Sequence, residues 1–366
     1  MSGSTYGTVF KIATWGESHG NGIGVVVDGC PSGLLLTEED IQVYLDRRKP
    51  GTSKFATQRK EGDQVEIISG VFEGRTTGTP IAMLVRNTDQ RSRDYSEIAN
   101  YYRPGHADLN FDVKYGFRDY RGGGRSSGRE TIARVAAGAV ACKLLQTLGV
   151  TLTTYTKSIG PVDVKPERFD PEEINRNPFH MPDPVAAGEA AAYLQECMHN
   201  QNSSGGVIEC VIRNFPQGAG EPVFEKLDAN LAKAIMSIGA VKGFEIGDGF
   251  AAARSTGLDN NDPYSIDASG NITKATNHAG GILGGISDGS DIIFRAAVKP
   301  TPSIAAPQMT VNRSQETQEI CIKGRHDPII VPRAVVVVES MAAVTLIDML
   351  FQSMTSRLDK ITEFFK

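Results

Sequence analysis

The chain has 366 residues, of which 40% are hydrophobic, enough for a large buried core in one domain or two. Its net charge of −5 and pI near 5.8 argue against a general nucleic-acid-binding protein. Five cysteines without CxxC spacing indicate neither a metal site nor a disulfide framework and suit a reducing compartment. With no signal pattern and no apolar run approaching membrane-span length, we expect a cytoplasmic protein without a membrane partner.

The first third of the chain is predicted to alternate short strands with turns. Residues 6–13 and 22–28 are expected to be strands that flank the glycine-rich turn WGESHGNG. Thr37 is the expected N-cap of a helix through Leu45, which ends before Pro50 and Gly51. Residues 65–71 and 80–85 are two further expected strands. The stretch 86–118 is predicted to be irregular, and an irregular run of this length usually serves a site or wraps a partner.

A helix is predicted from Gly128 to about Leu148, with Ser127 and Glu130 as a capping box. Small residues are frequent in it, so another backbone can pack closely and the helix should be central and buried. Further on, 151–165 and 206–213 are expected to be strands, and 184–200, 225–238 and 332–358 helices. The mixture lacks a regular βαβ order, which favours an α+β fold over a doubly wound sheet. Both long apolar helices follow a Gly-Arg turn, which hints at an internal duplication.

The stretch 119–134, DYRGGGRSSGRETIAR, is the strongest candidate for a binding site. Its consecutive glycines permit positive φ and close approach to a ligand, and the following helix start favours an anion. Arg121, Arg125 and Arg129 add cationic groups suited to phosphate or carboxylate. The alternative is a basic surface loop that only caps a helix. Residues 1–134 contain 18 Lys and Arg, of which 13 are Arg, which favours a local anion site inside an acidic protein.

Four of the six histidines lie beside glycine-rich turns, including His19 in ESHG and His106 in PGHAD. Each could be a general acid or a structural hydrogen-bonding group. Asp327, in RHDP, could be a base or an N-cap. No P-loop, HExxH, GxSxG or dinucleotide-binding context is present. Elimination or transfer on a phosphorylated small molecule fits these residues. A rival interpretation is an arginine-rich RNA-binding module.

Five blocks together resemble the chorismate synthase family: GESHGNGIG (16–24), RPGHAD (103–108), YRGGGRSSGRET (120–131), NHAGGILGG (277–285) and GRHDP (324–328). Their order and spread cover nearly the whole chain. A second rival to an enzyme is a non-catalytic flavin- or nucleotide-binding protein that kept the family's fold. The resemblance implies a β-α-β sandwich in a single large domain over residues 1–366, and a homotetramer. It also implies the anti 1,4-elimination of phosphate from 5-enolpyruvylshikimate 3-phosphate to give chorismate, with reduced FMN and, in some members, NADPH as its reductant.

The resemblance also assigns roles by position. His19 resembles the acid that protonates the leaving phosphate, with Ser18 beside it as a proton relay. His106 resembles the histidine at the flavin's pyrimidine edge, and Asp327 the carboxylate near flavin N5. The substrate-facing cations map onto Arg48, Lys54, Arg103 and Arg129, where Lys54 replaces the arginine of many members. The flavin contacts map onto Arg125, Ser126, Ser127, Gly239, Ala240, Gly284, Lys299, Pro300, Thr301, Pro302, Ser303 and Arg325. Many members have Asn where this chain has Gly239, so that contact could only be a backbone one.

Overall fold

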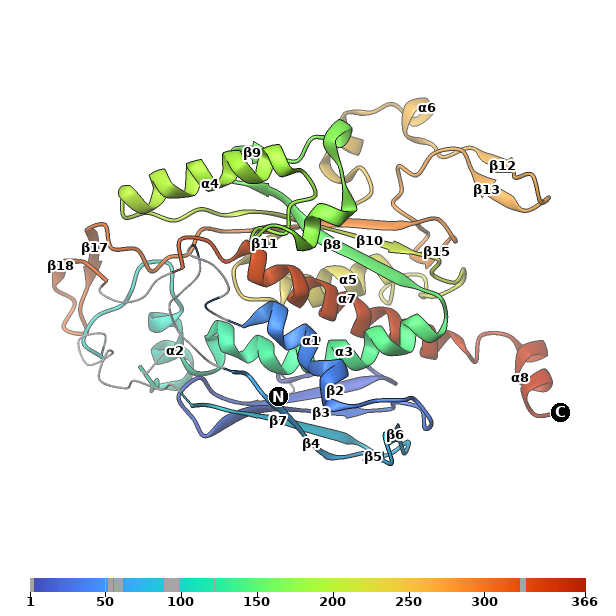
Figure 1. The fold of residues 1–366 in the computed structure, drawn as a ribbon, viewed down its shortest axis with the longest axis horizontal. Coiled ribbons are helices and arrows are strands. Elements are labelled where there is room, and N and C mark those ends of the chain that lie inside the picture. The colour runs from blue at the N-terminus through green and yellow to red at the C-terminus, as the bar shows by residue number, and fades with distance from the viewer. Residues whose placement is uncertain are drawn as a thin grey trace.

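The computed structural model describes residues 3–49, 51, 55, 62–88, 99–120, 123–322 and 327–366. Two antiparallel sheets form the outer layers, and four helices lie between them (Figure 1). The first sheet has the order β1 (Thr5–Tyr6), β2 (Lys11–Gly16), β3 (Gly22–Asp28), β7 (Ile81–Arg86) and β4 (Val65–Ser69). The second has the order β11 (Val241–Ile246), β16 (Ile292–Val298), β10 (Gly206–Arg213), β8 (Thr151–Ile159) and β9 (Val162–Asp163). The expected β-α-β sandwich is confirmed.

The helical layer consists of α1 (Glu38–Arg48), α3 (Thr131–Thr147), α5 (Leu227–Met236) and α7 (Val331–Ser353). Helix α4 (Pro184–His199) covers the outer side of the second sheet (Figure 1). The remaining helices are α2 (Asp108–Tyr115), α6 (Gly257–Asn260) and α8 (Leu358–Phe364). Short strand pairs are β5 (Val71–Phe72) with β6 (Arg75–Thr76), β12 (Tyr264–Ile266) with β13 (Ile272–Lys274), β14 (Ile282–Leu283) with β15 (Ile286–Ser287), and β17 (Gln308–Val311) with β18 (Thr317–Ile320).

The two halves of the sandwich share one topology. In the first, β2 and β3 are followed by α1, then by β4 and β7, and then by α3. In the second, β8 and β10 are followed by α5, then by β11 and β16, and then by α7, with α4 inserted after the first strand. The last strand of each unit lies between the second and the third, which gives the orders β2-β3-β7-β4 and β8-β10-β16-β11. This correspondence supports the internal duplication that the sequence only hinted at.

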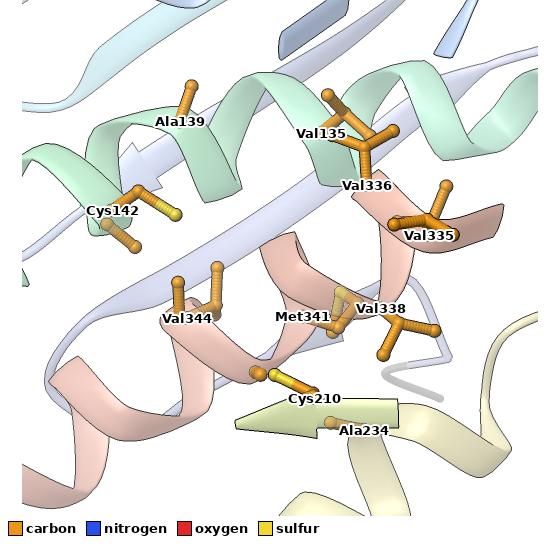
Figure 2. Packing of buried hydrophobic residues seen from close by; sticks show 14 of the residues in the cluster. Val135, Ala139, Cys142, Cys210, Ala234, Val335, Val336, Val338, Met341 and Val344 are labelled. Atoms are coloured by element: carbon orange, nitrogen blue, oxygen red, sulfur yellow. The ribbon is translucent and has the colours of Figure 1, made fainter. Parts of the chain in front are cut away.

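Helices α3 and α7 form the centre of the core. Val135 and Cys142 of α3 lie beside Val336 and Val344 of α7, whereas Ala139 points to the other side of α3 (Figure 2). At the closest point a Cβ atom added to Gly138 would lie 2.2 Å from the Cβ and 2.5 Å from the Cα of Ser340. The expectation of a central, buried helix that another backbone approaches closely is therefore confirmed. The same core continues from α7 to Cys210 on β10 and Ala234 on α5 (Figure 2).

Helix α7 has the length and hydropathy of a membrane span, so the expectation that no apolar run approaches that length was wrong. Of its most apolar window, 83% is buried inside the protein. The buried part of the helix also carries two carboxylates, each hydrogen-bonded to other groups of the protein. Charged groups of this kind would be costly in a lipid environment. Glu339 accepts two hydrogen bonds from Arg47, at 2.7 and 2.8 Å. Asp348 accepts from the backbone N–H groups of residues 8–10, at 2.7 to 3.0 Å. The helix is therefore the core helix of the sandwich.

Three local expectations need correction. The stretch 86–118, expected to be irregular, contains α2, although 89–98 lie outside the described residues. The predicted capping box does not form, because Ser127 caps a short 3-10 turn by accepting from the Arg129 N–H, and α3 begins only at Thr131. The last helix ends at Ser353, and a separate helix α8 follows it. The N-cap at Thr37 is confirmed, with Asp40 as its capping-box partner.

Candidate active site

Ser18 and His19 lie in the turn between β2 and β3, and both are buried. The turn needs glycine at its start, because Gly16 has φ +86° and a Cβ there would lie 2.2 Å from the Gly22 carbonyl oxygen. The Ser18 Oγ lies 3.1 Å from His19 Nδ1. Asn87, which follows β7, donates from Nδ2 to the carbonyls of Glu17 at 2.9 Å and Gly20 at 2.8 Å. The candidate acid is therefore held in a fixed turn with its hydroxyl neighbour.

Arg48 and Arg129 converge on one carboxylate, that of Asp63. Arg48 donates from Nη1 to Asp63 Oδ2 at 2.7 Å, and Arg129 from Nη1 to Asp63 Oδ1 at 3.2 Å. The Asp63 side chain is fully buried, and both guanidinium groups are nearly so. Arg48 also donates to Thr131 Oγ1 at 3.0 Å, which ties the end of α1 to the start of α3. Both guanidinium groups are of the kind that binds a carboxylate or a phosphate, and Asp63 fixes where they lie.

Arg103 and His106 lie in the segment that precedes α2. Arg103 donates to both oxygens of Asp108 at 2.8 Å, and Arg118 lies 3.0 Å from the same carboxylate. Burial acts to raise the pKa of Asp108, but the hydrogen bonds and charge of Arg103 outweigh it and hold the pKa at about 2. Asp108 therefore remains an anion that orients two arginines.

His106 contacts the segment 299–303, nearly 200 residues later in the chain. Its Nε2 lies 2.8 Å from the Oγ of Ser303, and Lys299 Nζ donates to the Gly105 carbonyl at 2.8 Å. A Cβ on Gly105 would lie 2.7 Å from Pro302, so glycine permits this approach. The Lys299 N–H in turn donates to the carbonyl of Ala240 at 2.9 Å. Four of the predicted flavin and catalytic positions, His106, Ala240, Lys299 and Ser303, are thus brought together.

Of the predicted flavin residues, Arg125 and Ser126 belong to the 3-10 turn Gly124–Ser126. Ser127 follows this turn and caps the next one, Gly128–Glu130, which leads into α3. The guanidinium of Arg125 donates to Thr14 Oγ1 at 2.6 Å and to the Gly16 carbonyl at 3.0 Å, so it fastens this turn to the end of β2. Arg134, one helical turn into α3, donates to Ser237 Oγ at 2.6 Å. Because Ser237 ends α5, this contact places the start of α3 beside Gly239 and Ala240.

A cavity of about 570 Å³ lies next to the turn that contains Arg125. It is lined by Glu17, Phe111, Phe117, Arg118, Asp119, Tyr120, Gly123, Gly124 and Arg125.

Asp327 reaches the site from the start of α7. Its Oδ2 lies 2.9 Å from Arg333 Nη1, and the Nε of Arg333 donates to the Arg48 carbonyl at 3.2 Å. This chain of contacts connects the candidate base to the end of α1. Arg333 therefore orients the Asp327 carboxylate.

Gly284 is not brought to this region. It lies in the β14–β15 hairpin, where Gly285 accepts from the N–H of Leu227 at the first residue of α5. Gly281 packs against Ile292 at the start of β16, whereas Lys299 follows its end, roughly 20 Å further along the strand. The predicted site residues Lys54 and Arg325 lie outside the described residues, as does Arg121.

Sequence reasoning did not single out Asp63, Asn87, Asp108 or Arg333. Each orients a candidate site residue, and Asp63, Asn87 and Arg333 lie outside the glycine-rich turns that contain a histidine. Asp108 was visible inside RPGHAD, and the need to balance two buried arginines was a physical signal for a carboxylate such as Asp63. Nothing in the local sequence distinguishes Asn87, because its partners at residues 17, 20 and 129 are distant in the chain.

Buried arginines, two histidines and an oriented carboxylate, gathered on glycine-rich turns of an α+β sandwich, define the class: an enzyme acting on a small polyanionic substrate. A family model described as chorismate synthase matches residues 10–351. The chain is 68% identical to the chorismate synthase of Agathobacter rectalis and 64% identical to that of Lachnoclostridium phytofermentans, each over all 366 residues and the whole length of both proteins. It also matches a solved structure titled "Crystal Structure of Chorismate Synthase", with a TM-score of 0.76 and 32% identity over 98% of this chain and 97% of the other.

The chain belongs to the chorismate synthase family. It is a lyase of the shikimate pathway that eliminates phosphate from a phosphorylated small molecule.

Proposed function

We propose that this site eliminates phosphate from 5-enolpyruvylshikimate 3-phosphate with reduced FMN as cofactor and no net oxidation or reduction. The observation that carries the proposal is the convergence of Arg48 and Arg129 on the single carboxylate of Asp63, beside the turn that contains His19. A substrate with two carboxylates and a phosphate needs cationic groups around it when it leaves water. Arg103 and, by family resemblance, Lys54 complete the cations assigned to the substrate.

His19 is proposed to protonate the departing phosphate, since a protonated phosphate is the better leaving group. Ser18 contacts His19 Nδ1, so its hydroxyl can fix the ring or relay a proton. Asp327 is proposed to take the ring proton as a carboxylate, in the orientation that Arg333 gives it. His106, oriented by Ser303, is proposed to contact the edge of the bound flavin.

The residues present fit a flavin. The backbone at residues 125–127 forms a 3-10 turn, and nearby Gly239 is open on its Cβ side and Ala240 is left-handed (φ +74°). Arg125, Ser126, Ser127, Gly239, Ala240 and 299–303 are the residues proposed to hold it, with Arg325 assigned by resemblance alone. When bound, reduced FMN supplies electron density that no side chain here can supply. NADPH is proposed as a possible reductant of that flavin.

We also propose one domain and a homotetramer. A continuous core from Phe10 to Met349 includes both sheets, which supports one domain. Gly284 lies far from the other flavin positions, so its assigned contact would have to come from a second copy. Leu258, Tyr264, Ile266 and Ile272 are 70 to 91% exposed around the β12–β13 hairpin, a surface suited to cover by another chain. Light scattering should give four times the chain mass of 39.4 kDa; a monomer would contradict the proposal.

An anaerobic assay tests the chemistry. We expect chorismate and phosphate to form in equal amounts when the protein is mixed with substrate and chemically reduced FMN. No product under these conditions would contradict the proposed elimination. A parallel reaction with NADPH and oxidised FMN distinguishes a protein that reduces its own flavin, which gives product, from one that needs an external reductant. The cytoplasm supplies such reductants and is the proposed location.

A further inference from the structure

Asn87 lies between the turn that contains His19 and the guanidinium of Arg129. Its Nδ2 donates to the carbonyls of Glu17 and Gly20, at 2.9 and 2.8 Å, on either side of Ser18 and His19. Its Oδ1 accepts from Arg129 at two nitrogens, Nε at 3.2 Å and Nη2 at 2.8 Å. One short side chain therefore touches both the candidate acid's turn and a candidate substrate cation.

The chemistry of these partners fixes the orientation of the amide. Backbone carbonyls only accept hydrogen bonds and a guanidinium only donates them, so Nδ2 must face the turn and Oδ1 must face Arg129. An aspartate at this position would place an oxygen against two carbonyl oxygens. Of the common side chains of this length, only asparagine satisfies both sides at once.

Arg129 is held on both sides of its guanidinium. Asp63 binds Nη1, and Asn87 binds Nε and Nη2. Asp63 supplies a negative charge next to Arg129, whereas Asn87 is neutral and only fixes the orientation of the guanidinium group. Because Asn87 is neutral, it orients the guanidinium without adding a second negative charge next to it.

The side chain of Asn87 is not needed to hold the sheet together. The pairing of β3 with β7 runs from Gly22↔Arg86 to Val27↔Ile81, all through backbone groups. The backbone N–H of Asn87 continues this pairing by donating to the Asn21 carbonyl at 3.2 Å. Removing the side chain should therefore loosen the turn and leave the strands intact.

We propose that Asn87 is a positioning residue, which fixes the distance and direction between the proton donor His19 and the substrate-binding Arg129. The proposal rests on the roles proposed above for those two residues. A proton donor must be within hydrogen-bond reach of the atom that it protonates, so a donor on a mobile turn is poorly placed. Asn87 supplies that constraint without entering the reaction.

The first test is hydrogen exchange of the reduced-flavin-bound enzyme and its Asn87→Ala variant. We expect amides in residues 17–21 to exchange at least about tenfold faster in the variant, since both hydrogen bonds from Asn87 to the turn are lost. Amides of β2 and β3 should be unchanged. Asn214→Ala is the matched control, because its Nδ2 donates to the Gly149 carbonyl at the other end of α3. Unchanged exchange in 17–21 would overturn the inference.

The second test is a double-mutant cycle on kcat at saturating substrate. Asn87→Ala alone should lower kcat about 10- to 100-fold, from the same two hydrogen bonds. In a His19→Ala background it should lower kcat less than about threefold, because a residue that acts through His19 has nothing left to position. Equal effects in both backgrounds would overturn the proposal and leave Asn87 a structural residue. If His19→Ala itself kept wild-type turnover, the proposed role of His19 as the acid would be wrong, and with it the role of Asn87 in positioning a proton donor. The hydrogen-exchange result would then show only whether Asn87 holds the turn.

Discussion

Gly138→Ala is expected to lower the free energy of unfolding by about 3 kcal/mol, the upper part of the range for overpacked cores. The added methyl group would lie 2.2 Å from the Cβ and 2.5 Å from the Cα of Ser340. Neither atom can move without shifting α7, because Ser340 is fully buried in the middle of that helix. Urea unfolding followed by circular dichroism gives the change in free energy.

Gly188→Ala is the matched control. Gly188 lies in the exposed face of α4, where a Cβ meets nothing within 4 Å. Replacement there should stabilise the protein by about 0.5 to 1 kcal/mol, because alanine loses less conformational entropy in a helix. If both variants were stabilised alike, the close α3–α7 contact would be wrong.

The position of Gly138 illustrates which part of the fold the sequence could predict. A run of small residues indicates a helix that packs closely, and the expectation was confirmed. An N-cap such as Thr37 acts through local geometry, so it too can be predicted from the sequence. Which strand lies between which others depends on contacts distant in the chain, and no local pattern encodes the order β2-β3-β7-β4.

Helix α7 shows why an apolar pattern alone is ambiguous. Its composition suits a lipid environment or a protein core equally. What distinguishes the two is the pairing of Glu339 with Arg47 and of Asp348 with the backbone of residues 8–10, both made with residues about 300 positions earlier. Only the folded arrangement reveals those partners.

For the site, the sequence predicts ligand-binding groups on glycine-rich turns with arginine and histidine. The structure gathers most of these positions, among them His19, Arg48 and Arg129 on one side and His106 with Ser303 on the other. It leaves Gly284 apart. The orienting residues Asp63 and Asn87 escaped prediction because an ion pair or amide bridge depends on tertiary contacts, whereas a turn depends on its own residues.

The largest effects on activity are expected from the two histidines. His19→Ala should lower kcat about 10²- to 10⁴-fold, the usual contribution of a general acid. His106→Ala should lower it by a similar factor, because Ser303 at 2.8 Å would no longer orient a group against the flavin. Neither change should alter the free energy of unfolding by more than about 1 kcal/mol, since neither histidine belongs to the hydrophobic core cluster. Single-turnover phosphate release with reduced FMN measures the first quantity, and urea unfolding the second.

His199→Ala provides the control, since His199 is exposed near the end of α4 and touches none of the site residues described above. It should retain wild-type kcat. The two active-site variants should also differ from one another in flavin affinity. His19→Ala should bind reduced FMN normally, because His19 is assigned to the phosphate, whereas His106→Ala should bind it more weakly. Near-normal turnover of either variant would contradict an acid–base role for that histidine. A loss of flavin affinity in His19→Ala and not in His106→Ala would exchange their assignments.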